Sequence, residues 1–143
     1  MAFNFDYRTR ISTFTVVAAI ALGVACLPAW AGEPLLSWQA YNGTIFVTGG
    51  VGEEELEEIN AARGDFNVRL LMAEKSGPYV AGVHVVIVDA SNSKVLEVDG
   101  AGPYLLVRLG VGVYRLQVTY GNRRQDRRLE VREGTSQAIT FYW

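Results

Sequence analysis

The chain has few of the side chains that most often act as nucleophiles, bases or metal ligands. Its 143 residues include one cysteine, Cys26, and one histidine, His84. A zinc site needs three or four nitrogen, sulfur or carboxylate ligands, and a hydrolytic triad needs a base held beside a nucleophile. Because His84 lies within the apolar run 83–88, we interpret it as a structural histidine inside or at the rim of the fold. The sequence therefore predicts no metal, no cofactor and no catalytic residue.

Apolar runs long enough to span a membrane are also absent, because the apolar run near the N-terminus is too short. Residues 11–25 are almost all apolar, whereas a transmembrane helix needs about 20 such residues. Two arginines precede the run, and Ala29 and Ala31 are the small residues that a signal peptidase recognises. We therefore expect residues 1–31 to be a signal peptide, cleaved after Ala31, and the mature protein to be periplasmic or secreted.

Cys26 leaves an alternative for the mature chain. Ala25 places a small residue before this cysteine, so acylation would give a membrane-anchored lipoprotein, although Gly23 occupies the position where leucine is expected. Cleavage after Ala31 instead removes the cysteine, and residues 32–143 then have neither a disulfide nor a thiolate. Such a chain must rely on its apolar core, and its length suits one domain that does not span the membrane.

Basic residues do not outnumber acidic ones. Residues 32–143 have 11 basic and 14 acidic side chains, a net charge of −3. Nucleic-acid-binding domains usually have an excess of positive charge, so nucleic acid is not an expected partner. The charges are unevenly placed, because six glutamates lie in residues 32–64 whereas ten basic side chains lie in residues 65–143.

Short apolar or alternating runs between turn residues dominate the second half of the chain. Residues 112–120 alternate most regularly, which predicts one face in the core and one in water. Residues 83–88 are apolar on both faces, which predicts a central strand covered on both sides. These runs predict a mainly β chain, an antiparallel, Ig-like β-sandwich of about seven strands. The expected strands are 68–73, 79–90, 94–98, 104–109, 112–120, 123–132 and 138–143.

Residues 32–67 are predicted to form a hairpin and an acidic helix. Asn42-Gly43 suits the two-residue turn of a hairpin, and an extended arm with a loop there is the alternative. An α-helix is expected over residues 53–63, because three glutamates lie in its first turn and Arg63 in its last. Gly64 is expected to end it in the left-handed conformation. A thin apolar stripe predicts that the helix lies on a sheet; it comprises Leu56, Ile59 and Ala62.

Three short motifs lie between residues 79 and 131. They are an opening strand at residues 81–85, an Asp99-Gly100 pair, and a strand at residues 109–118 with the sequence LGVGVYRLQV. Together they resemble the carboxypeptidase regulatory-like domain, a prealbumin-like (transthyretin-like) β-sandwich, which would occupy residues 68–143. The aromatic residue that usually follows the Asp-Gly pair closely comes later here, at Tyr104.

The resemblance implies an accessory or interaction domain, because such modules stand beside catalytic domains and lack their zinc site. The preceding segment is similar to that of small exported bacterial proteins with a Gly-Gly-Val-Gly stretch before a helix. The partner expected from this is another protein of the bacterial envelope. Some prealbumin-like surface modules form a Lys–Asn isopeptide bond, but residues 138–143 contain no asparagine to form one.

Basic side chains are concentrated in residues 123–132. A charged edge strand, which discourages aggregation between sheets, is one interpretation. The other is a surface for an anionic polysaccharide or lipid headgroups. The basic residues of this candidate surface are Arg123, Arg124, Arg127 and Arg128.

Acidic side chains are concentrated in the expected helix. They predict a solvated face or, alternatively, an interaction surface that comprises Glu54, Glu57 and Glu58. The preceding stretch 49–52, Gly-Gly-Val-Gly, is of the kind that holds a phosphate at a helix N-terminus. The glutamates that follow would repel such an anion, so no phosphate is expected there.

The remaining candidates are isolated in the sequence. Tyr79 and Tyr104 could contact a sugar, and the terminal aromatic residues 141–143 are expected to close the core. Turn and edge positions account for Asp89, Glu97 and Asp99. The prediction is a non-enzymatic binding or interaction domain of the bacterial envelope. The alternatives are a module that binds carbohydrate or anionic polymer, and a small hydrolase that depends on His84.

Overall fold

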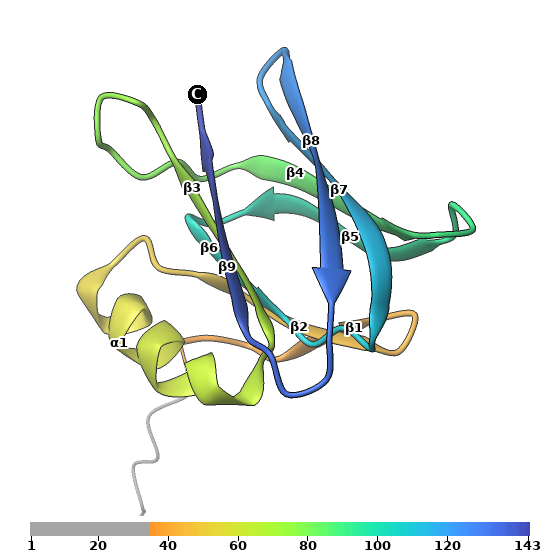
Figure 1. Ribbon diagram of the computed structural model, residues 1–143. Helices are drawn as coiled ribbons and strands as arrows, with labels where there is room; N and C mark the ends of the chain where they lie inside the picture. Colours follow the sequence, from red (N-terminus) through yellow and green to blue (C-terminus); the bar gives the residue numbers. More distant parts are fainter. Residues whose placement is uncertain (1–34) are drawn as a thin grey trace, which may run out of the picture. The chain divides into compact units, whose positions relative to one another are not determined.

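Strands occupy most of residues 35–143, the part of the chain that the computed structural model describes (Figure 1). The expected signal peptide, residues 1–31, and Cys26 lie outside the described residues. The described range contains nine strands and one α-helix, α1 (Glu53–Ala62). The prediction of a mainly β chain with one N-terminal helix is therefore confirmed. The strands number nine instead of about seven, because a hairpin before α1 adds two.

The strands form two sheets. One sheet has five strands, which pair in an antiparallel manner except for β3 and β9, which are parallel. Their order is β1 (Gln39–Tyr41), β2 (Thr44–Gly49), β6 (Tyr104–Val107), β3 (Val68–Ala73) and β9 (Gln137–Tyr142). The other sheet is antiparallel, in the order β5 (Lys94–Ala101), β4 (Val83–Asp89), β7 (Gly112–Tyr120) and β8 (Arg123–Val131).

The inner faces of both sheets contribute to one apolar core. Leu70 and Leu105 from the five-stranded sheet are completely buried, as are Ile87 and Leu116 from the four-stranded sheet. The two sheets thus pack face to face, as in a β-sandwich. Alternate residues along each strand point into this core, which is why the period-two pattern of residues 112–120 predicts β7 correctly.

A second apolar cluster lies between α1 and the outer face of the five-stranded sheet. Ile59 is completely buried against Val47 of β2 and Leu106 of β6, with Leu36 and Phe66 beside them. Figure 1 shows α1 on this side of the molecule, away from the four-stranded sheet. The thin apolar stripe therefore predicts the position of the helix correctly. The helix is not long and apolar enough to cross a membrane.

In the N-terminal segment, residues 32–67, the hairpin turn was predicted correctly but the end of the helix was not. Asn42 and Gly43 have φ of +47° and +83° and form the two-residue turn between β1 and β2, so the hairpin is formed. The predicted left-handed conformation of Gly64 is wrong, because Gly64 does not have a positive φ. The chain instead continues from α1 into a 3-10 turn, Arg63–Asp65, whose tighter hydrogen bonds end the helix without a left-handed residue.

The Asp99-Gly100 pair lies inside a strand and not in a turn, which corrects the expected end of this strand at residue 98. In the pairing of β4 with β5, Val83 lies opposite Ala101 and Val85 opposite Val98. An extra residue of β5 is therefore accommodated as a β-bulge, with Gly100 at φ +72°. The pairing also shows β4 to be a shorter strand than the expected 79–90.

Strand β4 is central, but its outer face is not covered by a second layer of the described chain. Val86 and Val88 are 9 % and 8 % exposed and belong to neither apolar cluster. In register they lie between longer polar side chains of β5 and β7, including Glu97 and Arg115. We infer that the aliphatic parts of these neighbours shield the valines.

Side chains bridge the two sheets where β8 and β9 come together. The Gln125 side chain donates to the carbonyl of Tyr142 (2.7 Å), and the Trp143 indole donates to the carbonyl of Arg123 (3.3 Å). Phe141 and Trp143 are buried, as expected of residues that close the core, whereas Tyr142 is exposed. These bonds occupy carbonyl groups at the edges of both sheets, which limits edge-to-edge pairing with another molecule.

The turn before β7 is held by a tyrosine. The Tyr114 hydroxyl donates a 2.9 Å hydrogen bond to the carbonyl of Gly110, four residues earlier. The tyrosine ring packs on the core that both sheets share. Because a tyrosine that bonds back to the preceding loop is typical of β-sandwich corners, this bond accounts for the Gly-x-Gly-x-Tyr spacing.

Replacing Tyr114 by phenylalanine is expected to lower the free energy of unfolding by about 1 kcal/mol, the usual net value of one hydrogen bond. Urea denaturation measures the change. Tyr142→Phe is the matched control, because the Tyr142 hydroxyl bonds to no described residue and its side chain is exposed. Equal stability of the two variants would show that the Tyr114 bond does not hold the corner.

Candidate functional site

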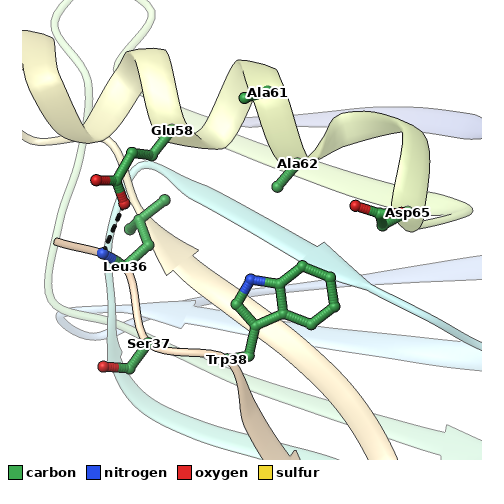
Figure 2. Close-up of a pocket in the computed structure, with 7 residues that line it drawn as sticks. All are labelled: Leu36, Ser37, Trp38, Glu58, Ala61, Ala62 and Asp65. Atoms are coloured by element: carbon green, nitrogen blue, oxygen red, sulfur yellow. Dashed lines mark hydrogen bonds between the residues drawn. The ribbon is translucent and has the colours of Figure 1, made fainter. Parts of the chain in front are cut away.

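A groove of about 700 Å³ runs between α1 and the segment that precedes β1. Its walls include Leu36 and Trp38 from this segment and Ala61 and Ala62 from the helix, with Asp65 at one end. Figure 2 shows the Trp38 ring across the groove from Ala62. The two alanines leave the space open because their side chains are small. A mostly apolar recess with a few polar groups is the usual form of a binding site.

The carboxylate of Glu58 fixes the position of the segment beside the helix. It accepts hydrogen bonds from the backbone N–H groups of Leu35 (3.2 Å) and Leu36 (2.9 Å). The Leu36 side chain is 6 % exposed and packs in the cluster beneath α1. Backbone donors that would otherwise lack a partner are thus satisfied, and the outer wall of the groove is fixed.

Trp38 is held on one side and exposed on the other. Its ring centroid lies 5.1 Å from that of buried Phe66, at an interplanar angle of 49°. The Arg108 guanidinium lies 5.8 Å from the Phe66 centroid and donates two hydrogen bonds to the Asp65 carbonyl. Despite this support, 53 % of Trp38 is exposed. An ordered, half-exposed tryptophan is a common anchor of protein interfaces.

The acidic helix uses part of its charge internally. The Glu55 carboxylate accepts hydrogen bonds from the N–H groups of Gly50 (3.0 Å) and Val51 (3.1 Å). The Gly-Gly-Val-Gly stretch therefore does hold an anion, and that anion is the side chain of the third helical residue. Among the predicted acidic residues, Glu58 holds the N-terminal segment, whereas Glu54 and Glu57 are exposed.

The predicted arginines lie on β8, an edge strand, and are divided between its two faces. Arg124 and Arg128 alternate with Arg123 and Arg127, so the four do not share one face. Arg124 is paired with Asp126 at 2.7 Å. Arg127 lies over the ring of Phe141, 5.7 Å from its centroid, at the edge of the core.

His84 is bonded to carboxylates on the outer face of the four-stranded sheet. Its Nδ1 forms a hydrogen bond with Asp99, and its Nε2 lies 3.8 Å from Glu97 Oε1. Glu97 also pairs with Lys94 at 2.6 Å. Within residues 35–143, no hydroxyl group is bonded to His84, and no group of three or more His, Cys, Asp or Glu is placed to hold a metal. Two carboxylates interpreted as edge residues thus converge on the histidine.

Asp89 is a turn residue, as the sequence predicts. Its Oδ1 accepts hydrogen bonds from the Ser91 hydroxyl (2.6 Å), the Ser93 N–H (2.9 Å) and the Ser91 N–H (2.8 Å). The bond from the Ser91 hydroxyl and then those from the backbone lower the pKa of the Asp89 carboxyl below its usual 3.8. The charged carboxylate therefore stabilises the turn between β4 and β5.

Tyr79 and Tyr104 come together although 25 positions separate them. Their ring centroids are 5.7 Å apart, and the Tyr104 hydroxyl donates to that of Tyr79 at 3.5 Å.

Sequence reasoning missed the groove and Trp38. The poor alternation of residues 36–41 was a usable signal, because an aromatic residue outside a regular pattern need not belong to a core.

Replacing Glu55 by alanine is expected to destabilise the protein by about 1–2 kcal/mol, because two backbone N–H groups lose their acceptor. Glu54→Ala removes the same charge from the first helical turn without breaking a hydrogen bond, so we expect a loss of only about 0.5 kcal/mol. Chemical denaturation compares the two. Equal losses would show that Glu55 acts through the helix dipole alone.

Replacing Asp89 by asparagine is expected to make the protein less stable at neutral pH and to leave its stability at acid pH nearly unchanged. Because folding lowers the pKa of this carboxyl, its stabilising effect is present above pH 3.8 and is lost as the pH falls toward the lower folded-state pKa. Thermal unfolding across this pH range measures the effect. A gap between the variant and the original protein that stays constant down to acid pH would contradict it.

No protein-family model matches the chain, and no curated protein or solved structure gives a significant match. The function proposed below therefore depends on the geometry of the groove and its surroundings.

Proposed function

We propose that the protein is a non-enzymatic binding domain of the bacterial envelope, and that it contacts another envelope protein through the groove beside Trp38. The observation that supports this best is a tryptophan that is ordered against Phe66 yet 53 % exposed at the edge of a groove. The export itself is proposed from the signal-like sequence of residues 1–31.

The composition of the groove favours a protein partner. Hot spots of protein interfaces are enriched in tryptophan, and a ring already held in place loses little conformational freedom on binding. The walls at Leu36, Ala61 and Ala62 are apolar, while Ser37 and Asp65 supply polar groups. This arrangement, an apolar centre with a polar rim, is that of an interface.

We further propose that the sandwich is a prealbumin-like module of the carboxypeptidase regulatory-like kind. The Tyr114 bond to Gly110 supports this, because it gives the Gly-x-Tyr motif a structural role at a sandwich corner. The position of Asp99-Gly100 in a bulge differs from the turn that the resemblance implies. The resemblance implies an accessory or interaction domain of the kind that stands beside catalytic domains, in keeping with a binding role.

The two alternative functions have weaker support. A polymer-binding surface on β8 is disfavoured because its arginines are divided between two faces and Arg124 is already paired. A hydrolase that depends on His84 is disfavoured because, within residues 35–143, no hydroxyl group is bonded to the imidazole that could serve as its nucleophile. Neither arrangement presents a converging set of groups to a substrate.

Site-specific photocrosslinking in the bacterial envelope tests the proposal. A photoreactive residue at Ser37, which lines the groove, is expected to give one defined protein adduct, whereas one at Thr119, on β7 of the other sheet, is expected to give none. Trp38→Ala is expected to weaken binding of that partner at least about 30-fold, as loss of a hot-spot residue does. Ala61→Gln fills the groove without removing core packing, and serves as a second variant.

Mass spectrometry of the adducts decides the outcome. The same adducts from both positions, or a Ser37 adduct that neither Trp38→Ala nor Ala61→Gln reduces, would contradict a specific contact at the groove. The thermal midpoint of each variant shows whether it is folded.

A further inference from the structure

A second recess, the basic cleft, lies on the other flank of α1. It has a volume of about 240 Å³, between Asn60 and Arg63 at the end of the helix and the outer face of β3 and β9. Tyr104 of β6 lies at its side. We propose that this basic cleft binds a single acidic sugar unit, with Arg63 and Arg69 holding the carboxylate.

The cleft exists because α1 covers only part of the five-stranded sheet. The helix packs on β2 and β6 through Val47 and Leu106, and leaves the β3–β9 side of the outer face open. In the parallel pairing, Arg69 lies beside Ala138 and Leu71 beside Thr140. The small side chains of β9 leave a hollow next to the longer ones of β3.

Two positive charges enter this hollow without a negative partner. No carboxylate of residues 35–143 lies within ion-pair distance of Arg63 or Arg69. Arg63 donates only to the Asn60 side chain, at 3.2 Å. Glu57, which lies one turn before Asn60 on the helix, forms no ion pair with either guanidinium.

The Tyr104 hydroxyl lies in the field of both charges. Its bond with Tyr79 and its burial raise the pKa of Tyr104, whereas the positive charges of Arg63 and Arg69 act to lower it. A tyrosine hydroxyl is protonated at neutral pH, and the raised pKa leaves it so; Tyr104, which lines the cleft, can therefore form hydrogen bonds there. Arg63, Arg69 and Tyr104 all line this cleft, so one small ligand in it can contact all three side chains.

The chemistry of the cleft fits a carboxylate on a polar ring. Guanidinium groups bind carboxylates through paired, charge-assisted hydrogen bonds. The Asn60 amide and the Thr140 hydroxyl can bond sugar hydroxyls, while Leu71 and the Tyr104 ring can contact the apolar face of a sugar. The volume is below the roughly 300–1,000 Å³ usual for drug-sized ligands, which favours one sugar unit. Tyr79, 54 % exposed beside Tyr104, offers a further ring surface at the side of the cleft.

This site is separate from the groove beside Trp38. The groove uses Ala61, Ala62 and the segment before β1, whereas the cleft uses Asn60, Arg63 and strands of the sheet. A sugar titration with purified protein involves no protein partner. Its failure is therefore distinguishable from failure of the proposed function.

Titration of the full chain with D-glucuronate, followed by two-dimensional ¹H–¹⁵N NMR, tests the proposal. Saturable shifts are expected for the amide signals of Asn60, Leu71 and Thr140. D-Glucose has the same ring without the carboxylate, and acetate and inorganic phosphate are anions without the ring. Each of these three probes is expected to bind at least about tenfold more weakly than glucuronate, because glucose lacks the carboxylate and the two anions lack the sugar ring.

Charge-neutral variants show which residues bind the probe. Arg63→Gln and Arg69→Gln are each expected to weaken glucuronate binding about tenfold or more, the effect of losing a hydrogen bond to a charged group. Arg128→Gln, on the other sheet, changes the net charge equally and is expected to leave the affinity unchanged. Arg63 is exposed at the end of α1, so its variant keeps the test valid if Arg69→Gln disturbs β3.

Three results would overturn the proposal. They are the absence of saturable shifts at the cleft, an equal effect of Arg63→Gln and Arg128→Gln, and binding of acetate or phosphate as tight as that of glucuronate. The last result would mean that the cleft recognises an anion and not a sugar.

Discussion

Two backbone segments touch at Gly49 and Gly102, and the position of both sheets depends on this contact. A Cβ atom on Gly102 would lie 2.9 Å from the Gly49 carbonyl oxygen, closer than side-chain carbons approach backbone. Here the chain leaves β5 of the four-stranded sheet and enters β6 of the five-stranded sheet. The Thr48 hydroxyl joins the two segments, because it accepts from the Gly102 N–H (2.9 Å) and donates to the Tyr104 carbonyl (3.0 Å). Because β6 then lies between β2 and β3, the crossing sets the order of strands beneath α1.

The same crossing determines where the helix begins and how its charge is used. The residues after Gly49 must turn away from the sheet, and Gly50 does so with φ +92° under the Tyr104 ring. The two N–H groups exposed by this turn are satisfied by Glu55 from within α1, and Glu58 satisfies two more in the segment before β1. The donors at Gly50 and Leu36 are partly buried and need acceptors, and here the helix provides them. Two of the five glutamates of this helix are therefore structural, which is why counting glutamates overstated its value as an interaction surface.

Local features could be predicted from the sequence, whereas features that join distant residues could not. The alternation in β7, the Asn42-Gly43 turn and the amphipathic helix each follow from neighbouring residues, and each was predicted correctly. The parallel pairing of β3 with β9 and the bulge at Asp99-Gly100 depend on register between strands, which a single strand does not encode. The groove and the basic cleft are of the second kind. Arg63 and Arg69 are close in sequence, but Tyr104 and Thr140 reach them only through the order of the five-stranded sheet.

Both recesses depend on the position of α1, which gives the helix a role beyond covering the sheet. Ala61 and Ala62 face the groove, while Asn60 and Arg63, at neighbouring positions, face the cleft. Successive helical residues point about 100° apart, so a short stretch can serve two opposite flanks while Ile59 points into the apolar cluster. A shift or rotation of the helix would therefore alter both recesses at once. The hydrogen bonds of Glu55 and Glu58, together with the burial of Ile59, oppose such a shift, and they thereby fix the geometry of the groove and the cleft alike.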